Sequence, residues 1–286
     1  MHISKQEFSL IRDYIEAKSG IFLGNEKMYL IENRLSDMIT RAGCSNFSEF
    51  YFKIKNDPSS SNLTLMMMDA ITTNETSWFR DPKTFLVLKE VILPELCDKI
   101  NIGGPDKINI WSAACSTGQE PYSISITALE FFHTKGGEKM CQKHIHIFAT
   151  DISASTIAAA TEAQYDSAAM KRGLPLNYME RYFQNIAPNR WLVRDNIRTM
   201  ITFKQHNLKV PLIENLPFHV IFLRNVIIYF SENFKQQLFR QIAKRMAPDG
   251  YLLLGTGEIL NSDFNAFDTV TYQGYSYYRL KKANKH

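Results

Sequence analysis

The chain has 286 residues, which suits one large domain or two smaller ones, and its 45% hydrophobic and 22% charged content is that of an ordinary globular protein. It has no uninterrupted run of about 18 apolar residues and no apolar signal core near Met1, so we expect neither membrane insertion nor secretion. The net charge of +4, without a basic and aromatic stripe, argues against nucleic acid and is compatible with an acidic protein partner.

Residues 3–70 predict an all-helical segment, because apolar residues recur there at the three- and four-residue spacing of a helix face. We expect a helix over residues 26–41, ended by Gly43, since a glycine commonly follows the last turn of a helix. A third helix is expected to begin near Asn46, whose spacing to Glu49 is that of a capping box. The first quarter of the chain therefore predicts a helical unit.

Basic residues form a regular series on the second of these helices. Lys27, Arg34 and Arg41 recur at intervals of seven, which places them in one strip beside the apolar face. Such a strip is compatible with a solvated helix edge and equally with a surface that binds an acidic helix. Both interpretations stay open at this point.

A polar and aromatic segment, residues 72–81, follows the helical unit. It contains several hydroxyl side chains and ends with Trp78, Phe79 and an arginine–aspartate pair. Polar groups this close to large aromatic rings are unusual in a plain linker and indicate a binding segment, although a capped domain junction would have similar residues. Helix is expected to resume over residues 84–90, with Pro94 disrupting its end.

The stretch at residues 108–123 has the most informative pattern. An apolar strand ends in a run of very small residues that includes Gly118, and a helix begins near Gln119. In α/β sheets the backbone approaches a nucleotide-like ligand at such a turn. The glycines of a dinucleotide fingerprint and the lysine of a phosphate-binding loop are both missing. Glu120 at the helix start disfavours a phosphate but suits an ammonium group.

A ligand with an adenosine half and an amino-acid half satisfies these conditions, which indicates S-adenosylmethionine. An ordinary tight turn between strand and helix is the alternative for this stretch alone. The next strand, residues 144–151, ends in Asp151, at the position where adenosine-binding folds hold the ribose hydroxyls. An N-cap for the helix that begins at Ser153 would also explain this aspartate.

Residues 164–206 depart from the alternation of strands and helices. We interpret them as a small β insertion, in which residues 191–193 and 200–203 form antiparallel strands around a polar turn. Asn207 and Leu208 close the insertion, after which the pattern of the sheet returns.

A buried strand over residues 219–223 leads to Arg224 and Asn225. These two residues lie at the strand tip, on the edge where α/β sheets bind ligands. A helix capped by Ser231 follows, and residues 270–280 suit a closing antiparallel pair.

The four cysteines are far apart and show no C-x-x-C spacing. We interpret them as free thiols, which favours a reducing cytoplasm as the location of the protein. His144 and His146 alternate with apolar residues as the polar face of a strand does, so no metal site is expected.

Six stretches together resemble the chemotaxis-receptor methyltransferases, the CheR family. They are TNETSWFRD at residues 73–81, CSTGQEPYS at 115–123, ATDI at 149–152, NL at 207–208, RNVIIYF at 224–230 and GYLLLG at 250–255. Each is weak alone, but six in the order of the family span most of the chain and form a specific signal.

The resemblance implies a fold and an activity. The fold is an α/β, Rossmann-like S-adenosylmethionine-dependent methyltransferase sheet with a small antiparallel β insertion, preceded by an all-α N-terminal domain. We expect the helical domain at residues 1–75 and the methyltransferase domain at 76–286, with the insertion at 164–206. Members of the family esterify glutamates on the cytoplasmic helices of membrane chemoreceptors, so S-adenosyl-L-methionine is the expected donor and S-adenosyl-L-homocysteine the expected product.

The resemblance also assigns roles to residues. Arg80 and Tyr229 fall on positions near the transferred methyl group, and Arg80 is expected to orient either the donor's carboxylate or that of the substrate. With Gly118 added from the turn described above, the expected donor-binding residues are Asn74, Thr76, Arg80, Gly118, Glu120, Asp151, Asn207, Leu208, Arg224 and Asn225. The basic strip of Lys27, Arg34 and Arg41 is the expected substrate-binding surface.

Three departures from the family pattern qualify these expectations. Gln119 replaces a common glutamate, while Glu120 is retained. Residues 36–40 are less cationic than in many relatives, which weakens the expected docking of a receptor helix. The turn before Leu192 lacks the Gly-x-Gly of members that bind a receptor's C-terminal pentapeptide, so we expect recognition without that peptide.

Two other functions are compatible with these residues. One is a methyltransferase that acts on a different protein or on a small molecule. The other is a donor-binding regulator or scaffold without catalysis, which is expected to lack the Arg80 or Tyr229 features that are present here.

Overall fold

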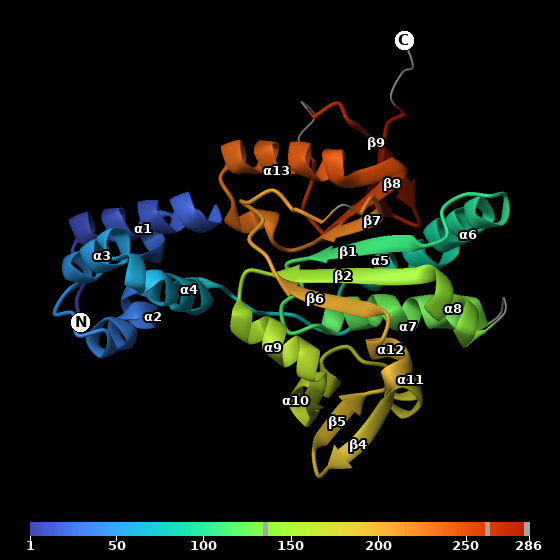
Figure 1. The fold of residues 1–286 in the computed structure, drawn as a ribbon, viewed down its shortest axis with the longest axis horizontal. Helices are drawn as coiled ribbons and strands as arrows, with labels where there is room; N and C mark the ends of the chain where they lie inside the picture. The colour runs from blue at the N-terminus through green and yellow to red at the C-terminus, as the bar shows by residue number, and fades with distance from the viewer. Residues whose placement is uncertain (134–136, 215, 261–263, 283–286) are drawn as a thin grey trace.

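The computed structural model describes residues 1–133, 137–214, 216–260 and 264–282. A helical N-terminal unit lies beside a larger unit built on a sheet, and an extended segment after α4 joins them (Figure 1). The chain is therefore an all-α unit followed by an α/β unit, as the sequence predicts. No helix in the described ranges is both long enough and apolar enough to span a bilayer.

The N-terminal unit consists of helices that bury one apolar face each. They are α1 (Lys5–Ser19), α2 (Met28–Arg41), α3 (Phe47–Asn56) and α4 (Ser61–Ile71), with the 3-10 turns η1 (Asn25–Lys27) and η2 (Pro58–Ser60) before α2 and α4. Ile11, Leu35 and Phe50 are central to their shared core. The side chain of Asn46 accepts the N–H of Glu49 at 2.8 Å, so the predicted start of α3 is confirmed.

The helix after the polar segment does not end where it was expected to end. It runs through α5 (Pro82–Val87), a π-helical turn η3 (Leu88–Ile92) and α6 (Leu93–Asn101). Pro94 is the second residue of α6, and the wide turn before it is closed by the N–H of Leu93 bonding to the carbonyl of Leu88. Pro94 therefore ends a hydrogen-bonding pattern and not the helix, because the π turn accommodates its missing N–H.

The main sheet has seven strands in the described residues, in the order β6-β2-β1-β7-β8-β10-β9. They are β1 (Ile108–Ala113), β2 (Ile145–Asp151), β6 (Ile201–Gln205), β7 (Phe218–Leu223), β8 (Met246–Leu254), β9 (Phe267–Tyr272) and β10 (Tyr275–Leu280). The first five strands in this order are parallel to one another. β10 pairs antiparallel with both β8 and β9, so the predicted closing antiparallel pair is confirmed.

The β insertion exists, and the predicted strand at residues 191–193 lies in it as part of β5, but its other strands are not those that the sequence predicted. Its sheet has the order β3-β5-β4, formed by β3 (Gln164–Asp166), β4 (Phe183–Ala187) and β5 (Arg190–Val193). The short helices α10 (Ser167–Lys171) and α11 (Leu176–Tyr182) lie between β3 and β4.

The expected antiparallel pair of residues 191–193 and 200–203 is wrong. Residues 201–205 form β6, which pairs in parallel with β2 in the main sheet. The polar stretch between them folds into the one-turn helix α12 (Asp195–Arg198) and not into a hairpin turn. Ile201 and Phe203 pack against the core of the main sheet, and this burial fixes β6 there.

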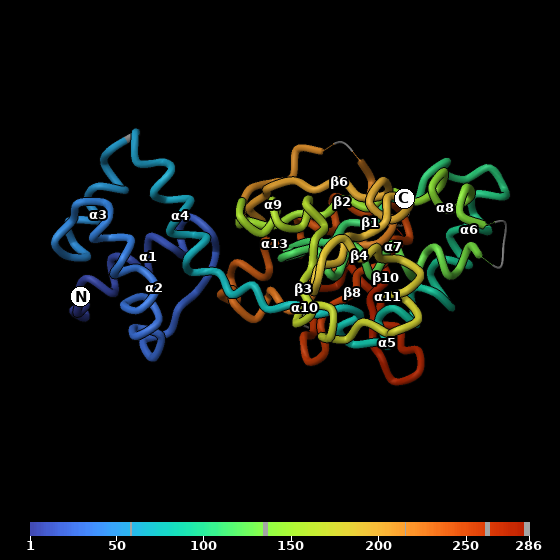
Figure 2. The backbone as a smooth tube through the Cα atoms, turned by 90° about the horizontal axis from the view of Figure 1, so that it is seen from below, coloured from blue at the N-terminus to red at the C-terminus, as the bar shows by residue number. Residues whose placement is uncertain are grey.

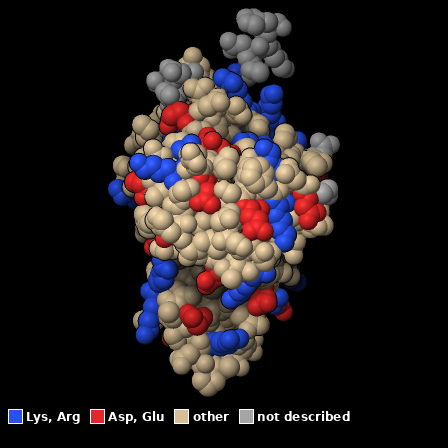
Figure 3. Space-filling view, turned by 90° about the vertical axis from the view of Figure 1, so that its left-hand side faces the viewer, with Lys and Arg blue, Asp and Glu red and all other residues tan. Residues whose placement is uncertain are grey.

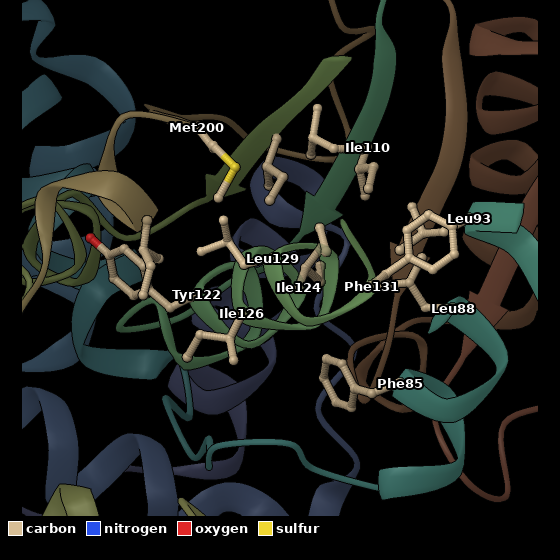
Figure 4. Packing of buried hydrophobic residues seen from close by; sticks show 14 of the residues in the cluster. Phe85, Leu88, Leu93, Ile110, Tyr122, Ile124, Ile126, Leu129, Phe131 and Met200 are labelled. Atoms are coloured by element: carbon tan, nitrogen blue, oxygen red, sulfur yellow. The ribbon is translucent and has the colours of Figure 1, made fainter. Parts of the chain in front are cut away.

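Alternate residues of the central strands point to opposite faces of the sheet, and each face has its own core. Ile110 of β1 and Phe222 of β7 belong to the core under α7 (Gln119–His133), as Figure 4 shows for Ile110, Ile124 and Leu129. Trp111 and Ile221, one residue along, belong to the core under α13 (Glu232–Arg245). Helices α8 (Glu138–His144) and α9 (Ala154–Glu162) flank β2.

The N-terminal unit contacts the sheet unit beside α9, where α4 packs, and along two further segments. The extended segment after α4 is one, and the loop after α1 is the other, where it lies beside the 3-10 turn η4 (Ile227–Tyr229) that precedes α13 (Figure 2). An isolated antiparallel bridge joins Ile21 to Phe230 there. Both segments lie at the carboxyl edge of the parallel strands.

Candidate active site

A cavity of about 530 Å³ opens at the carboxyl ends of β1, β2 and β7. Residues 114–116, 151–152 and 224–226, which end or follow these strands, form its base. The loop after α1 and the extended segment after α4 supply the other walls. The cavity therefore lies between the two units, at the sheet edge where α/β folds bind ligands.

The structure brings most of the predicted site residues to this cavity. Among the residues that line it are Lys27, Asn74, Thr76, Arg80, Glu120, Asp151, Asn207, Leu208, Arg224, Asn225 and Tyr229. They come from segments far apart in the sequence, and they converge because parallel strands present their carboxyl ends at one edge.

The turn after β1 has an unusual backbone. Ala114, Ser116 and Gly118 have φ of 61°, 50° and 93°, in the left-handed region that side chains other than glycine rarely adopt. The N–H of Ser116 donates to Asp151 Oδ2 at 2.8 Å, and its hydroxyl donates to the carbonyl of Asn74 at 3.1 Å. The turn is thereby bonded to β2 and to the extended segment.

Asp151 is a buried carboxylate held by main-chain groups. Besides the Ser116 bond, its Oδ1 accepts the N–H of Ser153 at 3.0 Å. Burial raises the pKa of this carboxyl, and the hydrogen bonds from Ser153 and Ser116 oppose that shift. Ser153, and not Asp151, is the side-chain N-cap of α9, because its hydroxyl accepts the N–H of Thr156.

Arg224 is the buried cation of the site, with a side chain that is 1% exposed. Its guanidinium donates to Glu120 Oε2 at 2.8 Å, to Asp81 Oδ2 at 2.8 Å and to the carbonyl of Arg80 at 2.6 Å. Burial alone would lower the pKa of Arg224, but the adjacent Glu120 and Asp81 charges raise it overall. One cation thus links β7, α7 and the start of α5.

The partners of Arg224 are themselves fixed. The other oxygen of Glu120 accepts the hydroxyl of Ser112 at 2.7 Å. The Nε–H of Arg224 is buried and has no hydrogen-bond partner among the described residues. A buried donor without a partner costs free energy, so Arg224 is held in this position at the expense of stability.

The tip of β7 is held by a residue outside the predicted set. Asn225 has φ of 56°, and its N–H donates to Glu258 Oε2 at 2.7 Å. The same oxygen accepts the N–H of Gly255 at 2.7 Å. A Cβ at residue 255 would come within 3.0 Å of both Asn225 and Glu258, so only glycine fits there.

The N-terminal unit is fastened to the sheet unit beside the cavity. The amide of Asn207 donates to the carbonyl of Lys18 at 2.7 Å, and the ammonium of Lys209 donates to the carbonyl of Glu16 at 2.7 Å. The N–H of Phe22 donates to the carbonyl of Tyr229 at 2.8 Å. We call the contacts of residues 16–22 with residues 207–209 and 229–234 the clasp.

Two family descriptions match consecutive parts of the chain: the CheR methyltransferase all-alpha domain matches residues 6–72, and the CheR methyltransferase SAM-binding domain matches residues 74–275. The chain belongs to the CheR methyltransferase family. It is 39% identical over 281 residues to chemotaxis protein methyltransferase 1 of Pseudomonas aeruginosa, covering 98% of this chain and all of that protein. It is 37% identical over 279 residues to the chemotaxis protein methyltransferase of Vibrio parahaemolyticus, covering 98% of each.

The cavity fits S-adenosylmethionine, the donor that the SAM-binding domain of CheR proteins takes. Its lining includes Asp151 at the tip of β2, three asparagines (Asn74, Asn207 and Asn225) and the Arg224–Glu120 pair. No group of three or more His, Cys, Asp or Glu side chains in the described ranges has the geometry of a metal site.

Three predicted site residues do not line the cavity. Gly118 lies under the turn, where a Cβ would press on Ala160 and Tyr165. The guanidinium of Arg34 donates to the carbonyls of Ile71 and Thr72, at 2.6 and 3.0 Å, at the end of α4.

The third, Arg41, is exposed in the last turn of α2. The basic strip of this CheR protein is therefore divided. Lys27 faces the cavity, Arg34 caps a helix and Arg41 faces solvent.

Sequence reasoning missed the partners that hold the site residues. Asp81 and Ser116 stand inside quoted motifs, but nothing in the sequence said that they bond to Arg224 and Asp151. Glu258 follows the Gly-Thr-Gly after β8, and that glycine pair was the available signal. Their bonds depend on which strand tips are adjacent, and this is a tertiary property.

Proposed function

We propose that this CheR family member transfers a methyl group from S-adenosyl-L-methionine to glutamate side chains on the cytoplasmic helical region of membrane chemoreceptors. The products are glutamate methyl esters and S-adenosyl-L-homocysteine, and the reaction takes place in the cytoplasm. One observation carries the proposal: the predicted residues from five separate motifs line one cavity at the sheet edge. The free thiols of Cys44, Cys115 and Cys141 are compatible with the location.

In this proposal, different residues of the cavity bind different parts of the donor. Asp151, at the tip of β2, binds the ribose hydroxyls, as acidic residues at this position do in adenosine-binding folds. Asn207, Leu208 and Asn225 border the adenosine half. Glu120 and Arg224, which line the cavity as an ion pair, meet the amino-acid half, where a carboxylate suits an ammonium group and a guanidinium suits a carboxylate.

The reaction requires little proton transfer by the protein. A free glutamate has a pKa of about 4.3, so the acceptor is already ionised at neutral pH and needs no general base. When bound, the donor supplies an electrophilic methyl group on a sulfonium sulfur. The acceptor oxygen forms a bond to that carbon as the carbon–sulfur bond breaks, and the electron pair of the broken bond stays on sulfur.

Charge disappears in this reaction, because an anion and a cation give neutral products. The contribution of the chain is therefore to align the acceptor oxygen and to exclude water. Arg80 is half-buried, and its Nη1 reaches the carbonyl of Glu75 at 3.3 Å, which leaves donors for a carboxylate at the cavity. Tyr229, with 37% of its surface exposed, stands at the mouth.

The substrate-docking part of the proposal rests on Lys27 and Arg41, which are exposed. Arg34 supports the docking surface indirectly, by fixing the end of α4 behind it. Charge reversal at Lys27 and Arg41 should weaken methylation at low salt and have less effect at high salt. The absence of Gly-x-Gly in the β insertion favours docking without a receptor pentapeptide.

The deciding experiment uses donor labelled in the methyl group and a purified cytoplasmic fragment of a methyl-accepting chemoreceptor. Label on the fragment that is released by mild base identifies a carboxyl ester. Arg80→Ala and Tyr229→Phe should each reduce transfer, and calorimetry with S-adenosylhomocysteine separates donor binding from catalysis. Parent rates in both variants would remove these residues from the mechanism.

Label on another protein or on a small molecule, with none on the receptor fragment, would favour the alternative substrate class. Donor binding without any transfer would favour a regulator.

A further inference from the structure

Three large apolar side chains stand at the mouth of the donor cavity, although each is exposed to solvent. Phe22, Ile228 and Tyr229 are 51%, 61% and 37% exposed, and all three line the cavity. Phe22 comes from the N-terminal unit, and the other two come from η4 of the sheet unit. We call these three residues the apolar rim.

The backbone under the rim is rigidly bonded. The N–H of Phe22 donates to the carbonyl of Tyr229 at 2.8 Å, beside the Ile21–Phe230 bridge. Within η4, the N–H of Tyr229 donates to the carbonyl of Val226 at 3.1 Å. Because the backbone is already fixed, only the side chains have to be ordered on binding, which lowers the entropic cost of docking.

Single exposed apolar residues are normal on a protein surface and need no explanation. The rim differs because all three members line the donor cavity, and the backbones of Phe22 and Tyr229 are hydrogen-bonded to each other. The surface around the N-terminal helices does not offer a large basic field instead. On that side of the molecule, acidic and basic side chains are interspersed around a broad uncharged area (Figure 3).

We infer that the apolar rim binds apolar side chains that flank the acceptor glutamate on the substrate helix; this inference rests on the proposed function. On a helix, residues three and four positions from the acceptor lie on the same face. When the acceptor extends into the cavity, those neighbours meet Phe22 and Ile228. Their contact holds the substrate helix over the mouth of the cavity.

The proposed contact involves both units of the chain, because both line the cavity. The rim is complete only when the clasp holds Phe22 against Tyr229. The specificity that the rim provides is for apolar residues at fixed positions around the acceptor, and it is independent of the charges on α2.

The test uses Phe22→Ser and Ile228→Ser with a chemoreceptor cytoplasmic fragment. We expect each variant to raise the KM for the fragment about tenfold, a typical cost for truncating an anchor residue, with little change in kcat. Binding of the labelled fragment, measured by fluorescence anisotropy with S-adenosylhomocysteine present, should weaken by the same factor. The effect should persist in salt of about 0.5 M, where contacts between exposed charges are screened.

The matched controls are Ile213→Ser and Leu176→Ser, at positions that are 88% and 79% exposed and do not line the cavity. Both should leave the KM for the fragment unchanged. A second fragment, with serine at the positions three and four residues from the acceptor, should lose affinity for the parent enzyme but not for Phe22→Ser. This non-additivity is the signature of a direct contact.

Several outcomes would overturn the inference. Additive effects of the two changes would show that the rim and the flanking residues do not meet. Weaker binding of S-adenosylhomocysteine to Phe22→Ser would assign the ring to the donor site. A change of oligomeric state in sedimentation would assign the rim to a second copy of the chain. If the parent enzyme does not methylate the fragment at all, the proposed function fails and not the rim alone.

Discussion

A polar side chain is buried at each end of β7, and the two ends satisfy it in opposite ways. Just inside the amino end, His219 is buried, and its Nδ1 accepts the N–H of Asn109 at 3.0 Å, in place of a carbonyl of the strand ladder. Just past the carboxyl end, Arg224 is buried as a cation between Glu120 and Asp81. One end is satisfied by a neutral group, and the other keeps charge inside the protein.

The difference follows from what each end has to do. A neutral hydrogen bond is sufficient to hold two strands together, so the amino end serves stability. A buried ion pair is a poor source of stability, because desolvation offsets its attraction. Its presence at the carboxyl end is therefore best explained by the ligand site that it organises.

The largest effect is expected from removing the cation. Arg224→Met keeps an unbranched apolar stem but leaves the Glu120 and Asp81 carboxylates without their partner. Breaking such a pair costs about 3–5 kcal/mol of unfolding free energy. Denaturant titration measures this loss, and calorimetry with S-adenosylhomocysteine should show no donor binding. A variant that keeps parent stability would show that the pair is solvated and that the contrast between the two ends is false.

The next effect concerns Glu258, which holds the tip of β7. Glu258→Ala leaves the N–H groups of Asn225 and Gly255 without an acceptor, at a cost of about 1–3 kcal/mol for each. Glu258→Gln keeps an acceptor oxygen and should restore donor affinity. The KM for the donor, the kcat and the unfolding free energy separate the two variants. Equal loss in alanine and glutamine would make the charge, and not the acceptor, the important property.

A smaller effect is expected at Asp151. Asp151→Asn places an NH2 group against one of two main-chain donors and should weaken S-adenosylhomocysteine binding about 10- to 100-fold, the value of a charged hydrogen bond. Burial raises the folded-state pKa of Asp151, so its contribution to stability is greatest below its ordinary pKa of 3.8 and declines as the pH rises through the folded-state value. The stability advantage of the parent over Asp151→Asn should shrink over that range. A difference in unfolding free energy between the two proteins that stays constant with pH would contradict this prediction.

The smallest effect belongs to the amino end. Burial, and to a lesser degree Lys99, lowers the pKa of His219 in the folded state. The unfolded chain therefore binds more protons near pH 6, and the stability present above the unfolded pKa of about 6.5 is lost as the pH falls. His219→Asn offers a carbonyl that does not titrate, so its unfolding free energy should fall less between pH 7.5 and 5.5, by at most about 1.4 kcal/mol per pH unit. Parallel slopes would mean that His219 is not neutral.

The two ends also show how far the sequence predicts this molecule. The strand over residues 219–223 follows from the hydrophobic pattern, and the structure has it as β7, with Arg224 and Asn225 lining the cavity just after it. The hydrogen-bond partners of Arg224 and Asn225 could not be predicted from this pattern, because Asp81 and Glu258 reach the β7 tip from segments more than 30 residues away. Pattern fixes which residues end a strand, whereas pairing depends on which strand tips become neighbours.

The error at β6 has the same origin. The alternation at residues 201–205 identifies a strand but does not say which sheet receives it. Burial beside β2 places this strand in the main sheet. The polar stretch before it, which resembled a hairpin turn, forms the helix α12. The Arg34 contacts are a further case, because a seven-residue spacing places side chains on one strip without showing which of them already have intramolecular partners.

The clasp has a consequence for engineering chimaeras. The seam between the helical and catalytic modules looks like the single connection after α4, yet Gly20 packs so tightly on Phe234 that a Cβ there would overlap the ring. A recombinant swap at residue 75 would exchange one half of this joint without the other. Hybrids should retain activity only when Gly20 to Phe22 and residues 229–234 are inherited from the same parent.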